Sequence, residues 1–277
     1  MNSLSRNILH YFSLVMTLLM ISGCSSGNKT TDSNYEKILR NDSIPQVIKN
    51  IVQSVHDNEA SAFAREVAYP LQRPYPLKDI LDEEEMKEYY PVLVDDSLRN
   101  VLVNSTPEEW QQFGWRGYSL KDGSYLWIDE SIYAVNYVSS SEENLIDSLT
   151  RVELNSLPEN LRMGWKPILT LLDPSTGKVY RIDVSVAQSA RTTPEYRLSV
   201  YDNVKDIEAL HSMPDLLLSG YMNVEGTASV VSYVFQGKNN EGFVIYPDDP
   251  GSGAPVIDLP DGSEQELRKA YWYELVE

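Results

Sequence analysis

The sequence predicts an α+β protein in which N-terminal helices pack on a small, curved antiparallel sheet, followed by an all-β sandwich or barrel. Two observations support this. Apolar residues first recur at helical spacing, and from Trp165 onward short runs of β-forming residues alternate with turn residues. Helices followed by strands are typical of α+β architecture. The 277 residues suffice for one large or two ordinary domains.

The first unit is expected to begin with four helices. Pro45 lies in the first turn of one helix, where its missing N–H does no harm, and Asp57 ends it. A short helix follows over residues 60–67, a third opens at the acidic run 82–85, and a fourth covers Asp95–Val103. We expect a single capped turn at residues 106–110.

The hydrophobic period then changes from helical to alternating. Trp115–Leu120 and Tyr125–Ile128 flank the turn residues 121–124, which predicts a hairpin, and Ile132–Val138 predicts a third strand. Ser141–Leu157 predicts a helix that connects this unit to the next. The strands expected in the second unit are Ile168–Leu172, Lys178–Val186, Tyr196–Tyr201, Leu216–Met222, Ser229–Phe235, Gly242–Tyr246, Pro255–Leu259 and Leu267–Tyr273.

The first 23 residues have the features of an export signal. Arg6 precedes an apolar core over residues 8–21, and the small residues Ser22 and Gly23 lead to Cys24. The core is shorter than the roughly 20 apolar residues of a membrane span. Ile21-Ser22-Gly23-Cys24 resembles the lipobox of bacterial lipoproteins, and this resemblance implies cleavage before Cys24 and lipid attachment to its thiol. Cys24 is the only cysteine of the chain.

This resemblance predicts a division of the chain and an address. We expect a signal peptide at 1–23, a flexible tether at 24–43, an α+β domain at 44–140, a helical connector at 141–164 and an all-β domain at 165–277. The anchor would hold the protein in the cell envelope. Polar rather than acidic residues follow Cys24, which favours the outer membrane with the protein facing the periplasm; the cell surface is the alternative.

The first domain also resembles the NTF2-like fold, in which helices pack on a curved sheet around a pocket. The resemblance covers residues 44–139 and depends on the helical start, on Tyr69-Pro70-Leu71 and on Gly114-Trp115-Arg116-Gly117 before the hairpin. It implies a pocket between the helices and the sheet. It does not by itself imply a function.

Composition and motifs give no sign of catalysis. The net charge of −18 argues against binding nucleic acid by charge. His56 and His211 each stand alone without metal-ligand spacing, and the chain has no nucleophile elbow, phosphate-binding loop or dinucleotide fingerprint. We therefore expect no metal and no cofactor.

The best candidate ligand site is the densest aromatic stretch. If residues 115–120 form a strand, Arg116 and Tyr118 share one face, and Arg116 could bind an anion inside a pocket. The alternative is that the tryptophans belong to the core and Arg116 pairs with a local acid. The candidate ligand-binding residues are Arg116, Trp115, Tyr118, Trp127 and Trp110.

These observations favour a lipid-anchored envelope protein that binds a protein partner, a glycan or a small ligand. Two alternatives remain open. One is an enzyme that uses an NTF2-like pocket. The other is an acidic inhibitor or immunity protein that neutralises a basic, envelope-directed hydrolase, which the net charge of −18 would suit.

Overall fold

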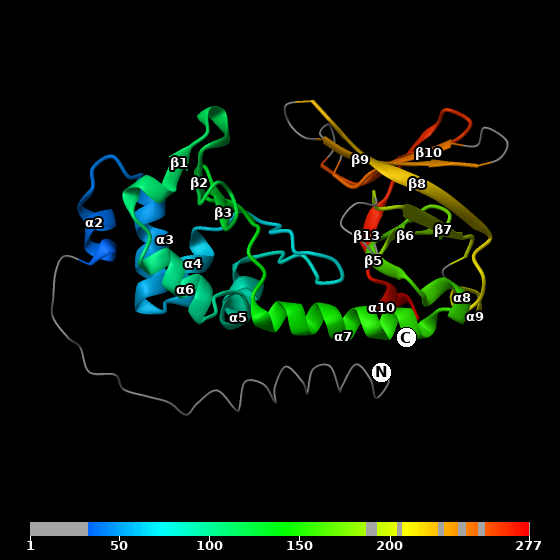
Figure 1. Ribbon diagram of the computed structural model, residues 1–277, viewed down its shortest axis with the longest axis horizontal. Helices are drawn as coiled ribbons and strands as arrows, with labels where there is room; N and C mark the ends of the chain where they lie inside the picture. Colours follow the sequence, from blue (N-terminus) through cyan, green and yellow to red (C-terminus); the bar gives the residue numbers. More distant parts are fainter. Residues whose placement is uncertain are drawn as a thin grey trace.

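The computed structural model confirms the α+β class. It describes residues 33–186, 193–203, 207–226, 230–237, 242–248 and 253–276. An N-terminal helical unit with a small sheet lies at one end, a β-barrel lies at the other, and the long helix α7 runs between them (Figure 1).

The helices of the N-terminal unit follow the apolar periodicity of the sequence. They are α2 (Asn34–Arg40), α3 (Gln46–Asp57), α4 (Ala60–Arg65), α5 (Glu83–Leu93) and α6 (Asp96–Val103). Asp82 and Asp95 cap α5 and α6, as their side chains accept hydrogen bonds from backbone N–H groups of the first turn. The apolar faces of the helices form one core with the small sheet.

Helix α2 differs from the expected tether. Residues 34–40 are helical within the segment 24–43, because Ile38 is completely buried in the core of the N-terminal unit. One buried isoleucine contributes about 2 kcal/mol of hydrophobic stabilisation, which favours ordering this short segment.

The small sheet is antiparallel with the order β1-β2-β3-β4. Its strands are β1 (Trp110–Gln112), β2 (Tyr118–Leu120), β3 (Leu126–Ile128) and β4 (Ile132–Val135). They are shorter than expected, and the expected capped turn is the 3₁₀ turn η1 (Pro107–Glu109), which carries a capping box. The buried face of the sheet packs on the helices.

The expected strand from Trp115 is wrong at its start. Gly114–Arg116 form the 3₁₀ turn η2, and the strand begins only at Tyr118. Gly117 enforces this break: its φ is +77°, and a Cβ there would lie 2.2 Å from the carbonyl oxygen of Ile128. Arg116 and Tyr118 therefore do not share a strand face.

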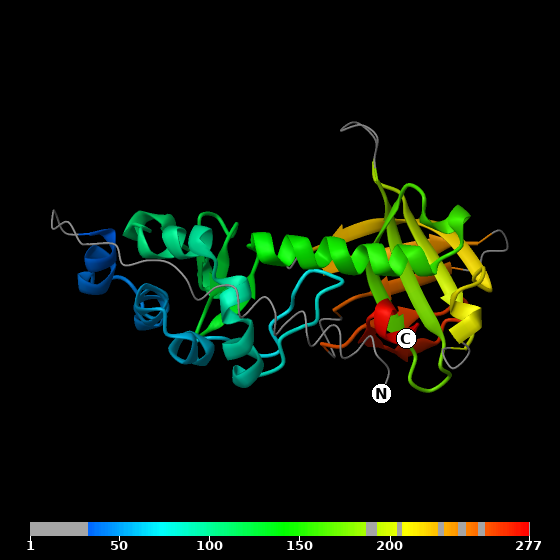
Figure 2. The same cartoon turned by 90° about the horizontal axis from the view of Figure 1, so that it is seen from below.

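Helix α7 (Ser140–Ser156) connects the two units (Figures 1 and 2). A capping box begins it: the Ser139 hydroxyl accepts from the backbone N–H of Glu142, and the Glu142 carboxylate accepts from the backbone N–H of Ser139. The short helix α8 (Glu159–Arg162) then leads into the barrel.

The second unit is an antiparallel meander with the order β12-β11-β10-β9-β8-β7-β6-β5-β13. Residues 264–270 pair with β11 through β12 and with β5 through β13, so the sheet is nearly closed into a barrel. The strands are β5 (Trp165–Leu172), β6 (Val179–Ser185), β7 (Tyr196–Tyr201), β8 (Leu216–Glu225), β9 (Val230–Gln236), β10 (Gly242–Tyr246), β11 (Val256–Asp258), β12 (Glu264–Glu266) and β13 (Arg268–Ala270). A four-residue helix, α9 (Ile207–Leu210), lies between β7 and β8.

The end of the chain corrects one expected strand. Leu267–Tyr273 is not a single strand: β13 ends at Ala270, and Trp272–Leu275 form α10. Trp272 is fully buried between the barrel wall and the helices, in a cluster with Leu157 and Tyr201.

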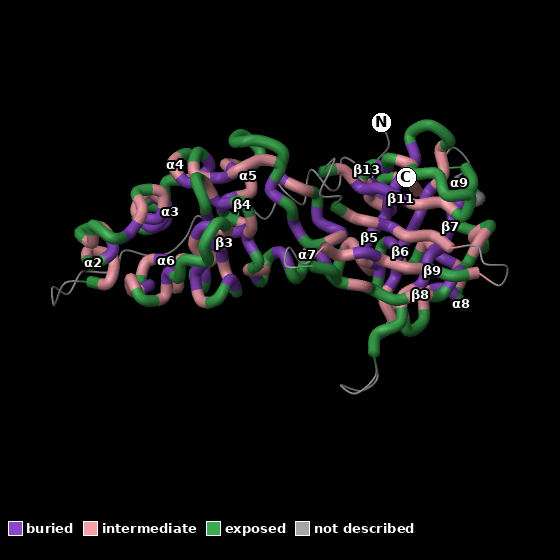
Figure 3. The backbone as a smooth tube through the Cα atoms, turned by 90° about the horizontal axis from the view of Figure 1, so that it is seen from above, coloured by how far each residue is buried: buried purple, intermediate pink, exposed green. Residues whose placement is uncertain are grey.

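The barrel wall has an apolar inner face and an outer face partly covered by α7, α8 and α10. Alternate residues such as Tyr180 and Ile182 fill the interior with aliphatic and aromatic side chains. Buried segments are seen in both units (Figure 3). Within the described ranges, no helix has the length and apolar character needed to cross a bilayer.

Candidate functional site

Of the five candidate ligand residues, Trp110 is buried, Trp115 is exposed, and Arg116, Tyr118 and Trp127 are half-buried. Trp110 is only 5% exposed, and its indole N–H donates to the hydroxyl of Ser105 at 3.0 Å. Tyr118 packs against the same core. Trp127 lies on β3; its indole packs over Gly123, where a Cβ would be 2.4 Å from Nε1, and its ring centre is 5.2 Å from that of Phe113. Trp110 and Tyr118 thus belong to the core of the fold, whereas Trp127 supports the turn between β1 and β2 through its contact with Phe113.

The exposed part is the turn between β1 and β2, which projects from the sheet (Figure 1). Trp115 is 79% exposed, and the guanidinium of Arg116 lies 5.3 Å from the centre of its ring. Phe113 and Tyr133 are 38% and 43% exposed, and the Tyr133 hydroxyl donates to the carbonyl of Arg116 at 3.0 Å. We call Phe113, Trp115, Arg116 and Tyr133 the aromatic tip.

The aromatic tip can form contacts but cannot enclose a ligand. An exposed tryptophan that stacks on an arginine combines a large apolar area with a cation, and both residue types are enriched among interface residues that dominate binding energy. The projecting turn suits a flat or extended partner. Cys24, the expected lipid attachment site, lies outside the described residues.

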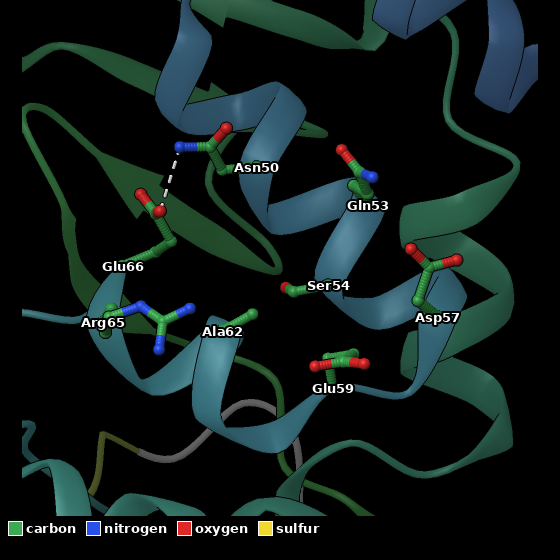
Figure 4. A pocket seen from close by; sticks show the side chains of 8 residues that line it. All are labelled: Asn50, Gln53, Ser54, Asp57, Glu59, Ala62, Arg65 and Glu66. Atoms are coloured by element: carbon green, nitrogen blue, oxygen red, sulfur yellow. Dashed lines mark hydrogen bonds between the residues drawn. The ribbon is translucent and has the colours of Figure 1, made fainter.

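The structure has an open polar pocket of about 330 Å³ between α3 and α4 (Figure 4). Its lining residues are Asn50, Gln53, Ser54, Asp57, Glu59, Ala62, Arg65 and Glu66. Asn50 donates to the Glu66 carboxylate at 2.9 Å, as the dashed line in Figure 4 shows. Nothing in the sequence pointed to this pocket, because its residues are ordinary polar positions on two amphipathic helices.

Two buried carboxylates on α7 form ion clusters that the sequence did not predict. Glu142 is completely buried and accepts two hydrogen bonds from Arg73, at 2.8 and 2.9 Å. It also accepts from the Tyr89 hydroxyl and from the backbone N–H of Ser139, both at 2.9 Å. Nη1 and Nη2 of Arg73 also donate to the carbonyls of Val135 and Tyr137. Each guanidinium nitrogen of Arg73 and each carboxylate oxygen of Glu142 thus takes part in a hydrogen bond.

The second carboxylate, Glu153, is equally buried but poorly paired. One of its oxygens accepts from the Tyr75 hydroxyl at 2.7 Å. The other lies 3.7 Å from Nη1 of Arg181 and makes no hydrogen bond within the described part of the chain. Burial raises the pKa of Glu153 to about 7, against the opposing effects of Arg181 and the Tyr75 hydroxyl.

Further charges surround Glu153 on the outer face of the barrel. Arg181 donates through Nε to Asp183 at 2.9 Å, and its guanidinium lies 4.8 Å from the ring centre of Trp272. Asp183 also accepts from Arg197, at 2.6 and 3.1 Å. Neither Nη atom of Arg181 nor the hydroxyl of Tyr201 has a hydrogen-bond partner among the residues described.

Among the residues that the structure describes, no group of three or more histidine, cysteine, aspartate or glutamate side chains could hold a metal ion. The two clusters on α7 are closed off from solvent, so neither offers a bound substrate access to its carboxylate. The geometry therefore supports contact through the aromatic tip better than chemistry at a buried acid.

Comparison with known proteins adds one partial similarity. No family model matches the chain, and no solved structure matches it. A stretch of 101 residues, 35% of the chain, is 31% identical to the ATP-NADH kinase YEF1 of Saccharomyces cerevisiae. The match spans only 20% of the length of the kinase. The NTF2-like resemblance of residues 44–139 stays a prediction.

Proposed function

We propose that this chain is a lipid-anchored cell-envelope protein whose task is binding, and that the aromatic tip contacts a protein or glycan partner. The lipid would be attached to Cys24, and the outer membrane with a periplasm-facing orientation is the proposed location. The observation that carries the binding function is the exposure of Trp115. A tryptophan that is 79% exposed stabilises the fold little, so a contact with another molecule is the better explanation for it.

The surroundings of Trp115 support a contact surface. Phe113 and Tyr133 extend the apolar area, and Arg116 adds a cation that the indole face holds in place. The other four tryptophans pack within the fold: Trp110 and Trp272 are buried, Trp165 lies against Arg197, and Trp127 lies against Phe113. Anchoring to a membrane would raise the local concentration of such a surface near envelope partners.

Site-specific cross-linking tests the contact. The full chain would be expressed in its native envelope with a photo-reactive phenylalanine analogue in place of Trp115. A matched control would carry the analogue in place of Met163, which is 75% exposed but lies far along the chain, between α8 and the first strand of the barrel. We expect a cross-linked species of defined mass from position 115 and none from position 163. Absence of a species from position 115, or the same species from both positions, would contradict the proposal.

The anchor has a separate test. Cells would be labelled with radioactive palmitate, and membranes would be separated from soluble protein. We expect label and membrane association in the wild type and neither in Cys24→Ser, because the sulfur of Cys24 is the atom to which the lipid would be attached. A labelled Cys24→Ser protein would place the lipid elsewhere and would overturn the assignment of Cys24.

A further inference from the structure

The two units are joined by a loop as well as by α7. Residues 71–80, which we call the bridging loop, extend from the N-terminal unit to the barrel (Figure 1). The Asp79 carboxylate forms an ion pair with Nζ of Lys269 at 3.0 Å. The backbone N–H of Asp79 donates to the Tyr271 hydroxyl at 3.1 Å. Tyr75 and Tyr271 stack with their ring centres 6.2 Å apart. The bridging loop therefore holds the barrel through a few polar and aromatic contacts.

Glu153 lies where the bridging loop, α7 and the barrel meet. The Tyr75 hydroxyl contacts Glu153 and also lies 2.8 Å from the hydroxyl of Thr170 on β5. The backbone N–H of Trp272 in α10 donates to the same Tyr75 hydroxyl at 3.4 Å. The phenol of Tyr75 thus connects the bridging loop to α7, β5 and α10, and it donates its hydrogen bond to one oxygen of Glu153.

The charged and titratable groups near Glu153 come from each element packed against it. Tyr75 comes from the bridging loop. Arg181 and Asp183 come from β6, and Arg197 and Tyr201 come from β7. Because Asp183 is the hydrogen-bond acceptor of both arginines, Glu153 is left with only a distant ionic partner. An ionised Glu153 would be a buried charge with little compensation.

We propose that Glu153 is the proton-sensitive element of a joint between the N-terminal unit and the barrel, which is tight when Glu153 is protonated and loosens when it ionises. Ionisation would favour hydration of the carboxylate, and water can reach it only if Tyr75 and the bridging loop move away from the barrel wall. This joint does not involve the aromatic tip, so its test does not depend on the proposed binding function.

The direction of the pH effect follows from the raised pKa. A glutamate has a pKa near 4.5 when exposed, and burial raises the pKa of Glu153 to about 7. The protonated form therefore stabilises the tight joint fully below about pH 4.5, and this stabilisation is lost as the pH rises to about 7. Between these values the equilibrium constant for opening rises by up to about tenfold per pH unit, and above about pH 7 it levels off.

Hydrogen exchange at the backbone amide of Asp79 reports on the joint, because this amide donates to Tyr271 across it. Protection factors, corrected for the intrinsic pH dependence of exchange, would be measured on the full chain at pH 5.0, 6.0, 7.0 and 8.0. We expect protection in the wild type to fall by at least tenfold between pH 5 and 7 and to change little above pH 7. In Glu153→Gln, which cannot ionise, we expect a change of less than about twofold over the same range.

Two further variants make the result decisive. Glu143→Gln removes the same charge from an exposed position of α7 and should keep the wild-type profile. Tyr75→Phe removes the hydroxyl that favours the ionised form, so the fall in its protection should continue to a higher pH than in the wild type before it levels off. The proposal is overturned if wild-type protection does not fall between pH 5 and 7, or if it falls equally in Glu153→Gln.

Discussion

Glu142 and Glu153 lie eleven residues apart on α7, close to three helical turns, so both face the same side of the helix. Both side chains are completely buried. Glu142 accepts four hydrogen bonds, two of them from one guanidinium, whereas Glu153 accepts one from a phenol. The same residue type in the same helix thus has two different environments.

The difference in hydrogen bonding between Glu142 and Glu153 shows that a buried carboxylate can either fix a structure or make it sensitive to pH. At Glu142 the charge is compensated, and the cluster fixes the start of α7 to Arg73 and to the carbonyls that end the small sheet. At Glu153 the compensation is poor, so protonation is the easier way to bury the group. The cluster around Glu142 therefore fixes the two elements together at any pH at which Glu142 is ionised, whereas the cluster around Glu153 is suited to respond to pH.

The largest expected effect comes from breaking the compensated cluster. Arg73→Met keeps the apolar stem but leaves Glu142 buried without its cation, and we expect a loss of about 3–5 kcal/mol in the free energy of unfolding. Urea denaturation at pH 7 measures it. Arg151→Met, at an exposed position of α7, is the control and should change stability by less than about 0.5 kcal/mol. A loss below about 1 kcal/mol in Arg73→Met would mean that Glu142 does not depend on this pairing.

At Glu153 we expect a substitution to increase the free energy of unfolding rather than to decrease it. At pH 8 the folded protein must hold Glu153 ionised or open around it, and Glu153→Gln removes this cost. We expect the variant to be more stable than the wild type at pH 8 by on the order of 2 kcal/mol, and nearly equal to it at pH 4.5. Denaturation at the two pH values measures the difference. A variant that is clearly less stable at pH 8 would show that the charge is compensated after all.

A smaller effect is expected at the capping box that places Glu142. Ser139→Ala removes a hydroxyl that accepts from the Glu142 backbone N–H and donates to the carbonyl of Val92. We expect a loss of about 1 kcal/mol, measured by thermal denaturation, with Ser140→Ala as the neighbouring control. An equal effect of both substitutions would argue that the cap does not set the start of α7.

The smallest effect on stability is expected at the aromatic tip. Because Trp115 is largely exposed, Trp115→Ala should change the free energy of unfolding by less than about 0.5 kcal/mol while abolishing partner capture in the envelope. Calorimetry and a pull-down from native membranes measure the two effects. A stability loss above about 1 kcal/mol would show that Trp115 is a packing residue of the fold.

Much of the fold could be predicted from local pattern. The bounds of β7 (Tyr196–Tyr201) and β10 (Gly242–Tyr246) coincide with the expected strands, because β7 alternates apolar and polar residues and β10 is a short run of β-forming residues next to turn residues. The strand order and the near closure through residues 264–270 could not be predicted, because they depend on pairing between distant segments. The aromatic run 271–273 is typical of a strand in the sequence, although Trp272–Leu275 form the helical turn α10.

The candidate site was only partly accessible from sequence. The aromatic stretch drew attention to Trp115 and Arg116, and the glycines at 114 and 117 were a signal for a turn that the strand assignment overlooked. The buried carboxylates gave no usable signal among 41 acidic residues. Arg73 lies 69 residues from Glu142, and only the folded chain brings them together.

The most direct test of the central claim is a carboxyl ¹³C titration of Glu153 in the full chain, with the resonance assigned by its absence in Glu153→Gln. Our account predicts a midpoint near pH 7, because burial raises the pKa of Glu153 by more than Arg181 and the Tyr75 hydroxyl lower it. A midpoint near 4.5 would mean that Glu153 is ionised and compensated in the folded protein, and it would contradict the contrast between the two carboxylates.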